Sequence, residues 1–198
     1  MKFAGCTILL SVFISLCTGK QSFIIRDCEN PDNAAVSLKS GSVKPYPVAI
    51  PGIVTVTGSG SVNRNLTGGG LDLQVHIERY VGFLWVTVPC ISDVGSCHYD
   101  LCNKLSEAFS AKGCPAELKA NNVPCTCDTL KPGTYSLNAQ KFTIPELSGL
   151  YSWLASGDYK VDLKLTDRAT KKQVGCVHLE GTIVDGNACE GFLCSIFG

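Results

Sequence analysis

Cysteine and histidine are the residues of this 198-residue chain whose types and spacing could carry chemistry. Six of its cysteines lie between Cys90 and Cys127, and His98 directly follows Cys97. A thiolate beside an imidazole could act as a nucleophile, and cysteine and histidine together could bind zinc. Oxidised in pairs, the same cysteines would instead form disulfides.

The start of the chain favours disulfides, because it predicts secretion. Lys2 provides a short basic start, residues 7–16 are mostly apolar, and small residues before the end of segment 1–19 predict signal-peptide cleavage after Gly19. Removing this segment leaves ten of the twelve cysteines. An even number in a secreted chain gives no reason for one thiol to stay reduced. Zinc is disfavoured too, since Cys125-Thr126-Cys127 is spaced too closely for the common Cys-x-x-Cys arrangement.

No other motif predicts catalysis, a metal or a cofactor. His76 and His178 fall on the polar faces of predicted strands, where a solvated histidine is the default interpretation. The chain has no Gly-x-Ser-x-Gly elbow, no His-Glu-x-x-His and no phosphate-binding glycine loop. With 17 basic and 17 acidic residues and no basic stripe, nucleic acid is not an expected partner. We therefore expect a protein that is not an enzyme. A weak lipid esterase is the catalytic alternative, although no convincing nucleophile can be named for it.

The elements that position these residues are mostly strands. Leu71, Leu73, Val75 and Ile77 alternate with polar residues, which is typical of a half-buried antiparallel strand. The same pattern recurs over 161–166 and 177–183, and β-branched or aromatic runs occupy 53–57 and 83–88. Residues 99–109 instead have helical spacing, and residues 167–172 indicate a hairpin turn. The prediction is an all-β, immunoglobulin-like two-sheet sandwich or cup with one short disulfide-tied helix.

Asn65-Leu66-Thr67 forms a glycosylation sequon directly before three glycines. We expect a glycan on Asn65, in an exposed hairpin loop.

An ordered series of short motifs carries a family resemblance. The motifs are Gly82-Phe83-Leu84-Trp85-Val86-Thr87-Val88-Pro89-Cys90, Val94-Gly95-Ser96-Cys97, Val123-Pro124-Cys125-Thr126-Cys127, Lys131-Pro132-Gly133-Thr134-Tyr135, Ile144-Pro145-Glu146-Leu147, Ser152-Trp153-Leu154 and Gly157-Asp158-Tyr159. In this order they resemble the ML-type, MD-2-related lipid-recognition superfamily over about residues 22–184, and within it the lysosomal activators of hexosaminidase. The domain is thus expected at 20–184, followed by an extension at 185–198 with no counterpart in the family.

The resemblance implies a β-cup whose two sheets enclose a lipid-sized apolar cavity. It also implies four disulfides: Cys28–Cys176, Cys90–Cys97, Cys102–Cys127 and Cys114–Cys125. In the extension, Cys189 and Cys194 could close a small loop. That extension is either a stapled surface segment or an added membrane or partner contact.

The function implied is that of a non-enzymatic cofactor. Such a protein lifts a glycosphingolipid from a membrane, which it contacts transiently, and presents the lipid to a soluble beta-hexosaminidase. The expected location is the secretory pathway, in the lysosome and/or outside the cell. A secreted carrier or sensor of another lipid (sterol, fatty acid or phospholipid) is the alternative, and the sequence does not separate the two.

Candidate lipid contacts follow from the resemblance and the strand patterns. The expected rim contacts are Leu147, Leu150, Tyr151, Trp153 and Leu154, with packing into the core as the alternative. The expected cavity-wall residues are Ile53, Leu73, Val75, Trp85 and Leu163.

Overall fold

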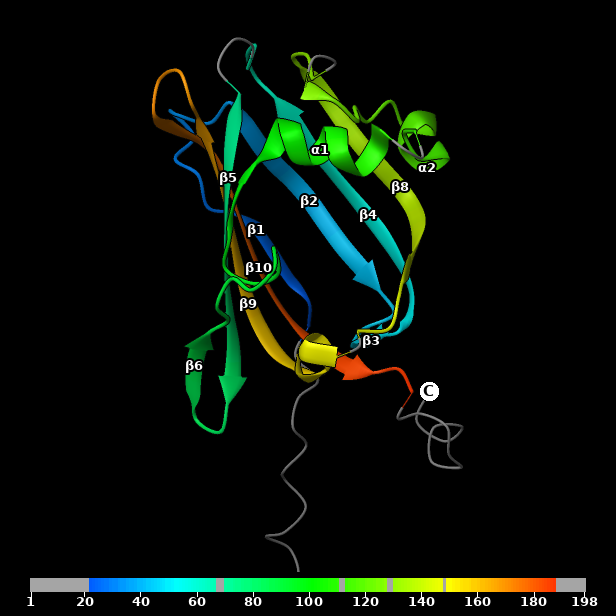
Figure 1. Cartoon of the computed structure of the whole chain (residues 1–198). Coiled ribbons are helices and arrows are strands. Elements are labelled where there is room, and N and C mark those ends of the chain that lie inside the picture. The colour runs from blue at the N-terminus through cyan, green and yellow to red at the C-terminus, as the bar shows by residue number, and fades with distance from the viewer. Residues whose placement is uncertain (1–21, 67–69, 111–112, 128–129, 148, 188–198) are drawn as a thin grey trace, which may run out of the picture.

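The computed structural model describes residues 22–66, 70–110, 113–127, 130–147 and 149–187. The predicted signal peptide (1–19) and the predicted Cys189–Cys194 disulfide lie outside the described residues. Within the described residues the fold is a two-sheet β-sandwich with short helices, as predicted (Figure 1).

The larger sheet is built from the strands whose alternation is clearest in the sequence. Its path runs through β1 (Ile24–Asp27), β10 (Lys172–Asp185), β9 (Gly157–Asp167), β5 (Leu71–Val81) and β6 (Leu84–Thr87). Two short strands join it: β3 (Val48–Ile50) pairs in parallel with β10, and β7 (His98–Asp100) pairs with β5. The predicted turn at 167–172 connects β9 to β10.

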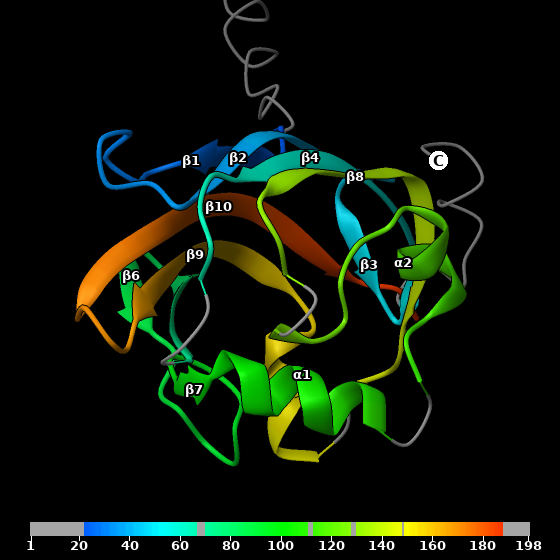
Figure 2. The same ribbon diagram turned by 90° about the horizontal axis from the view of Figure 1, so that it is seen from above.

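The smaller sheet has three antiparallel strands, in the order β2 (Val36–Lys44), β4 (Gly52–Val62) and β8 (Gly133–Ile144). The sheets approach each other along β1 and β2, where the amide of Leu38 donates a 2.7 Å hydrogen bond to the Asp27 carboxylate. From above, the opposite edges of the two sheets diverge, and α1 (Leu101–Ser110) lies between them (Figure 2). The sandwich is therefore closed on one side and splayed on the other.

Helix α1 is the helix predicted from residues 99–109. Asp100 accepts a 3.0 Å hydrogen bond from the amide of Asn103 at its start, and this bond is the main reason that the pKa of Asp100 is lowered. Arg168, in the β9–β10 turn, binds the carboxylates of Asp100 and Asp72 and so ties the turn to the helix and to β5. The sequence predicted one helix, but the structure also contains α2 (Ala116–Ala120) and the 3-10 helix η2 (Gly149–Leu154).

The tightly packed core occupies one end of the cup. It is built from Ala35, Val62, Leu66, Leu71 and Val174, and Leu101 of α1 packs against it. Val62, Leu71 and Val174 lie at the end of β4 and the beginnings of β5 and β10, while Ala35 directly precedes β2 and Leu66 follows β4. Because Leu101 packs against them, the core lies beside α1. Only Leu71 and Val174 among the large described side chains are less than 2% exposed. The packing thus closes one end and leaves the remaining space between the sheets unfilled.

All four disulfides implied by the resemblance are present: Cys28–Cys176, Cys90–Cys97, Cys102–Cys127 and Cys114–Cys125. The first joins residues 148 apart, linking the beginning of the domain to β10. Two others hold the α1–α2 region, since Cys102 lies in α1 and Cys114 directly precedes α2. The covalent links therefore reinforce the closed end of the cup.

Candidate lipid-binding site

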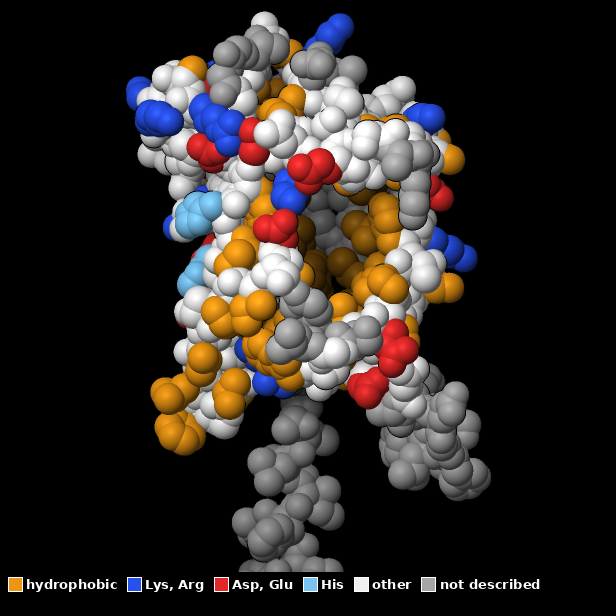
Figure 3. Space-filling model, in the orientation of Figure 1, with side chains coloured by type: hydrophobic (Ala, Val, Ile, Leu, Met, Phe, Trp, Pro, Cys, Tyr) orange, Lys and Arg blue, Asp and Glu red, His pale blue; other side chains and the backbone are white. Residues whose placement is uncertain are grey.

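A pocket of about 420 Å³ lies between the two sheets. Figure 3 shows the hollow below α1, edged by hydrophobic side chains. Most of its side-chain surface is aliphatic or aromatic; the apolar residues that line it are Phe23, Ile25, Val36, Leu38, Val43, Val56, Val123, Tyr135, Leu137, Val177 and Leu179. This volume falls within the range of about 300–1,000 Å³ that is usual for small-molecule sites.

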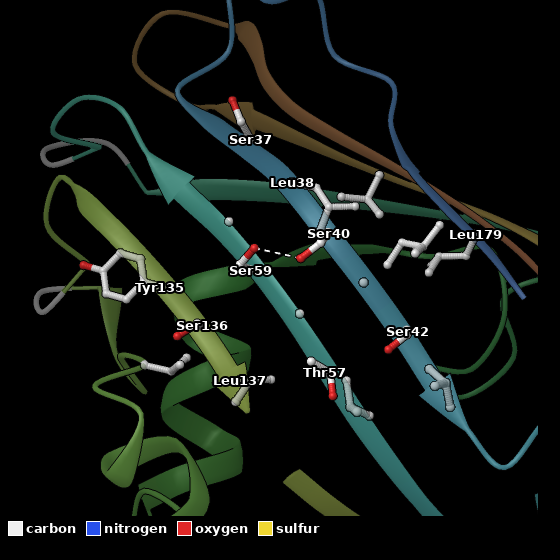
Figure 4. A pocket seen from close by; sticks show the side chains of 18 of the residues that line it. Ser37, Leu38, Ser40, Ser42, Thr57, Ser59, Tyr135, Ser136, Leu137 and Leu179 are labelled. Atoms are coloured by element: carbon white, nitrogen blue, oxygen red, sulfur yellow. Dashed lines mark hydrogen bonds between the residues drawn. The ribbon is translucent and has the colours of Figure 1, made fainter. Parts of the chain in front are cut away.

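Small residues of the three-stranded sheet keep the pocket open. Two Ser/Gly runs, residues 40–42 of β2 and 58–60 of β4, contribute to the lining. A side chain at Gly41 would place its Cβ 2.6 Å from the Cδ1 atom of Ile25, so glycine permits β1 to approach β2 there. The hydroxyls of Ser40 and Ser59 bond to each other at 2.8 Å (Figure 4). Sequence analysis did not identify these residues, because it predicted no strand at 40–42 and ended the 53–57 strand before Gly58. The alternation of serine and glycine in both runs was the available signal.

The seven-stranded sheet contributes the opposite wall. Leu179 of β10 lines the pocket across from Leu38 of β2 (Figure 4). Directly opposed residues of an antiparallel sheet share a face. Val177 opposes Leu163, and Leu163 opposes Val75, so these two predicted wall residues lie on the cavity face. Leu73 belongs to the next row on that face, but all three lie outside the lining of the 420 Å³ pocket. Their contact with a lipid stays a prediction.

The other two predicted wall residues, Ile53 and Trp85, do not lie on the cavity face. Ile53 is 61% exposed on β4, whereas its neighbour Val54 is buried, so Ile53 points away from the interior. Trp85 opposes Tyr80, which lies on the opposite face of β5 from Val75. Trp85 was misplaced because the apolar run 83–88 indicates a strand but does not show which face of that strand is covered.

The β5–β6 hairpin instead presents a cluster of large exposed apolar side chains. Phe83 at its tip is 81% exposed and Leu84 is 57% exposed. Together with these, the surface that we call the hairpin patch comprises Tyr80, Val81, Trp85 and Val86. The patch projects beyond the hollow on the side of β5 (Figure 3). Lys160 lies over the Trp85 ring, 4.3 Å from its centroid, so a cation borders the patch.

The predicted rim segment is the 3-10 helix η2, at the opposite end of the cup from α1 (Figure 1). Trp153 is 43% exposed and Leu154 is partly buried. Leu147, just before η2, borders a smaller pocket of about 110 Å³ together with Glu146. The side chains of Leu150 and Tyr151 lie outside the described atoms, so their predicted role is untested. Trp153 is the rim side chain with the most exposed ring among those described, and its contact with a lipid or membrane stays a prediction.

Two of the groups considered for chemistry, Cys97 and His178, take part in other interactions. Cys97 is bonded to Cys90, so it offers no thiol beside the exposed His98. Both ring nitrogens of His178 face carboxylates, with Nδ1 2.6 Å from Asp162 and Nε2 2.8 Å from Glu180. Burial opposes the charged form of His178, but these hydrogen bonds outweigh it and raise the pKa. A ring held at both nitrogens has no free position to serve as a general base.

Two further observations concern metals and membrane spans. In the part of the chain that the structure describes, no three His, Cys, Asp or Glu side chains gather as a metal site would require. Across the same residues, the helices are too short or too polar to cross a bilayer. Asn65 is exposed in the loop after β4, as a glycosylated residue must be, while Thr67 of its sequon is outside the described residues.

Comparisons with known proteins identify the family of this chain. The family model described as the ML domain matches residues 22–183. The chain belongs to the ML-domain family of lipid-recognition proteins, whose members are typically non-catalytic. It is 34% identical over 164 residues to the ganglioside GM2 activator of Macaca fascicularis, covering 82% of this chain and 83% of that protein. The Mus musculus ganglioside GM2 activator is 33% identical over 159 residues, covering 79% of each chain.

Two solved structures are also similar. One is a Niemann-Pick type C2 protein from the Japanese carpenter ant, with a TM-score of 0.38 and 10% identity over 81% of this chain and 99% of that one. The other is chicken MD-1 complexed with lipid IVa, with a TM-score of 0.36 and 11% identity over 82% of this chain and 99% of that one.

Proposed function

We propose that this protein is a lipid-transfer cofactor that extracts a glycosphingolipid from a membrane and presents its sugar to a soluble beta-hexosaminidase in the lysosome. The observation that carries this proposal is the 420 Å³ pocket, lined largely by apolar side chains, between the two sheets of an ML domain. The identity of about a third to two ganglioside GM2 activators supports the choice of lipid. The hexosaminidase is the partner that the family resemblance implies.

The apolar pocket addresses the main energetic barrier to extraction. Each methylene moved from hydrocarbon into water costs about 0.8 kcal/mol. An acyl chain of about 16 carbons would therefore cost roughly 13 kcal/mol if it left the bilayer unsheltered. Aliphatic side chains such as Leu38 and Leu179 replace the bilayer as the surroundings of that chain. Sheltering the acyl chain requires a pocket of suitable shape with an apolar lining, and it requires no catalytic residue.

The exposed apolar side chains supply the transient contact with the membrane. Phe83 and Leu84 at the tip of the hairpin patch can enter the interface between headgroups and acyl chains. Trp153 is an aromatic side chain of the kind enriched at that interface. The patch is small, so binding by it alone stays reversible, as extraction requires.

The proposal is tested with phosphatidylcholine vesicles that contain a fluorescent ganglioside GM2. The secreted protein is expected to release the ganglioside into the supernatant after the vesicles are pelleted. It is also expected to stimulate cleavage of the vesicle-bound ganglioside by beta-hexosaminidase, but not cleavage of a water-soluble substrate. Release without stimulation would reject the activator role in favour of a carrier. Failure to release or bind any lipid would contradict the proposal as a whole.

A further inference from the structure

Arg79 lies where the hairpin patch and the rim segment meet. It is the residue of β5 that directly precedes the patch, and its guanidinium reaches the segment after η2. Nε and Nη2 both donate to the carbonyl oxygen of Ser156, at 3.2 and 2.9 Å. The guanidinium carbon lies 5.7 Å from the centroid of the Trp153 ring. One side chain thus contacts both the backbone and the exposed aromatic ring of the rim.

Tyr159 and Gly157 allow the Arg79 side chain to reach the segment after η2. Tyr159 opposes Arg79 in the β5–β9 ladder, and its hydroxyl donates a 3.0 Å hydrogen bond to the carbonyl of Leu154. Gly157 has a φ of +133°, and a Cβ on it would lie 2.9 Å from Nε of Arg79. A glycine is therefore favoured here by the backbone conformation, and it also leaves room for the Arg79 guanidinium. The end of η2 is held at two carbonyls, by Arg79 and by Tyr159.

We infer that Arg79 is a positioning residue for lipid extraction, because it holds Trp153 in the orientation in which the indole contacts the bilayer. A planar guanidinium can lie near an aromatic ring while two of its N–H groups donate to the same carbonyl oxygen, whereas a lysine ammonium is a point charge on a flexible chain. An indole oriented in advance loses less conformational freedom when the protein binds the membrane. This inference rests on the proposed function, since it assigns a role in that extraction step.

The test compares Arg79→Met and Arg79→Lys with Arg64→Met, which removes an exposed arginine from the loop before β5. Every protein also carries Trp85→Phe, so Trp153 is its only tryptophan. The first readout is acrylamide quenching of Trp153 fluorescence in the absence of lipid. The second is the initial rate of extraction of a fluorescent ganglioside from vesicles of phosphatidylcholine, which have no net charge.

Arg79→Met is expected to increase quenching of Trp153 and to lower the extraction rate about tenfold, the equivalent of about 1.4 kcal/mol. Arg79→Lys is expected to recover only part of the rate, and Arg64→Met to leave both readouts unchanged. Unchanged quenching in Arg79→Met would overturn the inference. A full recovery by lysine would also overturn it, because any positive charge would then suffice.

Failure of the inference is distinguishable from failure of the proposed function. Uptake of a fluorescent fatty acid from vesicle-free solution reports pocket filling without a membrane step. It is expected to be equal in all the variants, because Arg79 lies outside the pocket lining. If the reference protein takes up no lipid at all, the proposed function fails, while the quenching comparison still decides whether Arg79 positions Trp153.

Discussion

His178 lies between two carboxylates on the outer face of the seven-stranded sheet. Its side chain is 13% exposed, and its ring nitrogens contact Asp162 and Glu180. The pKa of His178 is raised above its ordinary value, despite the opposing effect of burial. Its hydrogen bond lowers the pKa of Glu180 in turn. The interaction between the two side chains is therefore strongest when His178 is protonated and Glu180 is ionised.

Protonation of His178 should make the folded state more stable in mild acid. Because its folded pKa exceeds the unfolded value of about 6.5, this stabilisation is complete below that value and is lost as the pH rises through the folded pKa. Glu180 keeps its contribution until the pH falls through its own lowered pKa.

We predict that His178→Gln lowers the melting temperature more at pH 5.5 than at pH 8. A loss of roughly 1 kcal/mol for this partly exposed cluster corresponds to about 2–4 °C. Thermal unfolding followed by circular dichroism at the two pH values measures the difference. A melting temperature lowered equally at both values would show that the charge on His178 contributes nothing.

The β5–β6 hairpin is the element that contacts the membrane in our account. Its apolar residues occur on both faces, yet β6 is an edge strand with exposed side chains throughout. Strands that are apolar on both faces are commonly covered by other elements. An exposed run of this kind therefore indicates a surface that contacts a partner or a membrane. The structure assigns residues 83–87 to an exposed surface, and only Val88 at the end of the run is buried.

We predict that Phe83→Ser weakens binding to phosphatidylcholine vesicles about tenfold or more without changing the melting temperature. Burial of a phenylalanine side chain is worth about 1.5–3 kcal/mol, and Phe83 contributes little to folding because it is 81% exposed. Vesicle co-sedimentation measures the binding. Ile24→Ser is the matched control, because Ile24 is 39% exposed but lies opposite Glu180 on the outer face of the sheet. Equal losses in both variants would remove the hairpin from the membrane contact.

The pocket between the sheets should be blocked by a larger side chain on its wall. Leu179→Trp is expected to lower lipid affinity at least tenfold while the protein stays folded, since the added ring enters space that the core does not fill. Lys164→Trp is the control, because Lys164 is exposed and opposes Gln74 on the outer face. Titration with a fluorescent fatty acid measures both. Undiminished binding by Leu179→Trp would place the lipid elsewhere.

More of the strands and helices than of the lipid-binding site could be predicted from the sequence. Alternation from Leu71 to Ile77 identified β5, and helical spacing from Leu101 to Phe109 identified α1, because both patterns follow from backbone geometry. Which face of a strand is covered depends on a partner sheet, so Ile53 and Trp85 were misplaced. The contact between Arg79 and Ser156 joins residues 77 apart, and no local pattern indicates it.

In the molecule as a whole, disulfides stabilise a cup whose interior contains an apolar pocket. The Cys28–Cys176 bond spans 148 residues, whereas Cys90–Cys97 spans only seven. In the chain-entropy model, a link that closes a longer loop removes more freedom from the unfolded chain. The long-range link should therefore contribute more to stability.

We predict that replacing Cys28 and Cys176 by alanine lowers the free energy of unfolding by about 2–5 kcal/mol. Replacing Cys90 and Cys97 is expected to have a smaller effect, because only a short loop is released. Guanidinium denaturation of the two double variants makes the comparison. A larger loss from the short-range pair would show that local geometry, and not loop closure, determines the contribution.

The lipid proposed to lie between the two sheets of this ML domain can be identified from the protein itself. Native mass spectrometry of the secreted, deglycosylated protein, followed by extraction of the bound lipid, makes this identification. We expect a one-to-one complex with a glycosphingolipid, and loss of that complex in Leu179→Trp. A protein that carries a sterol or a phospholipid instead, or that carries no lipid, would show that the proposed function is wrong.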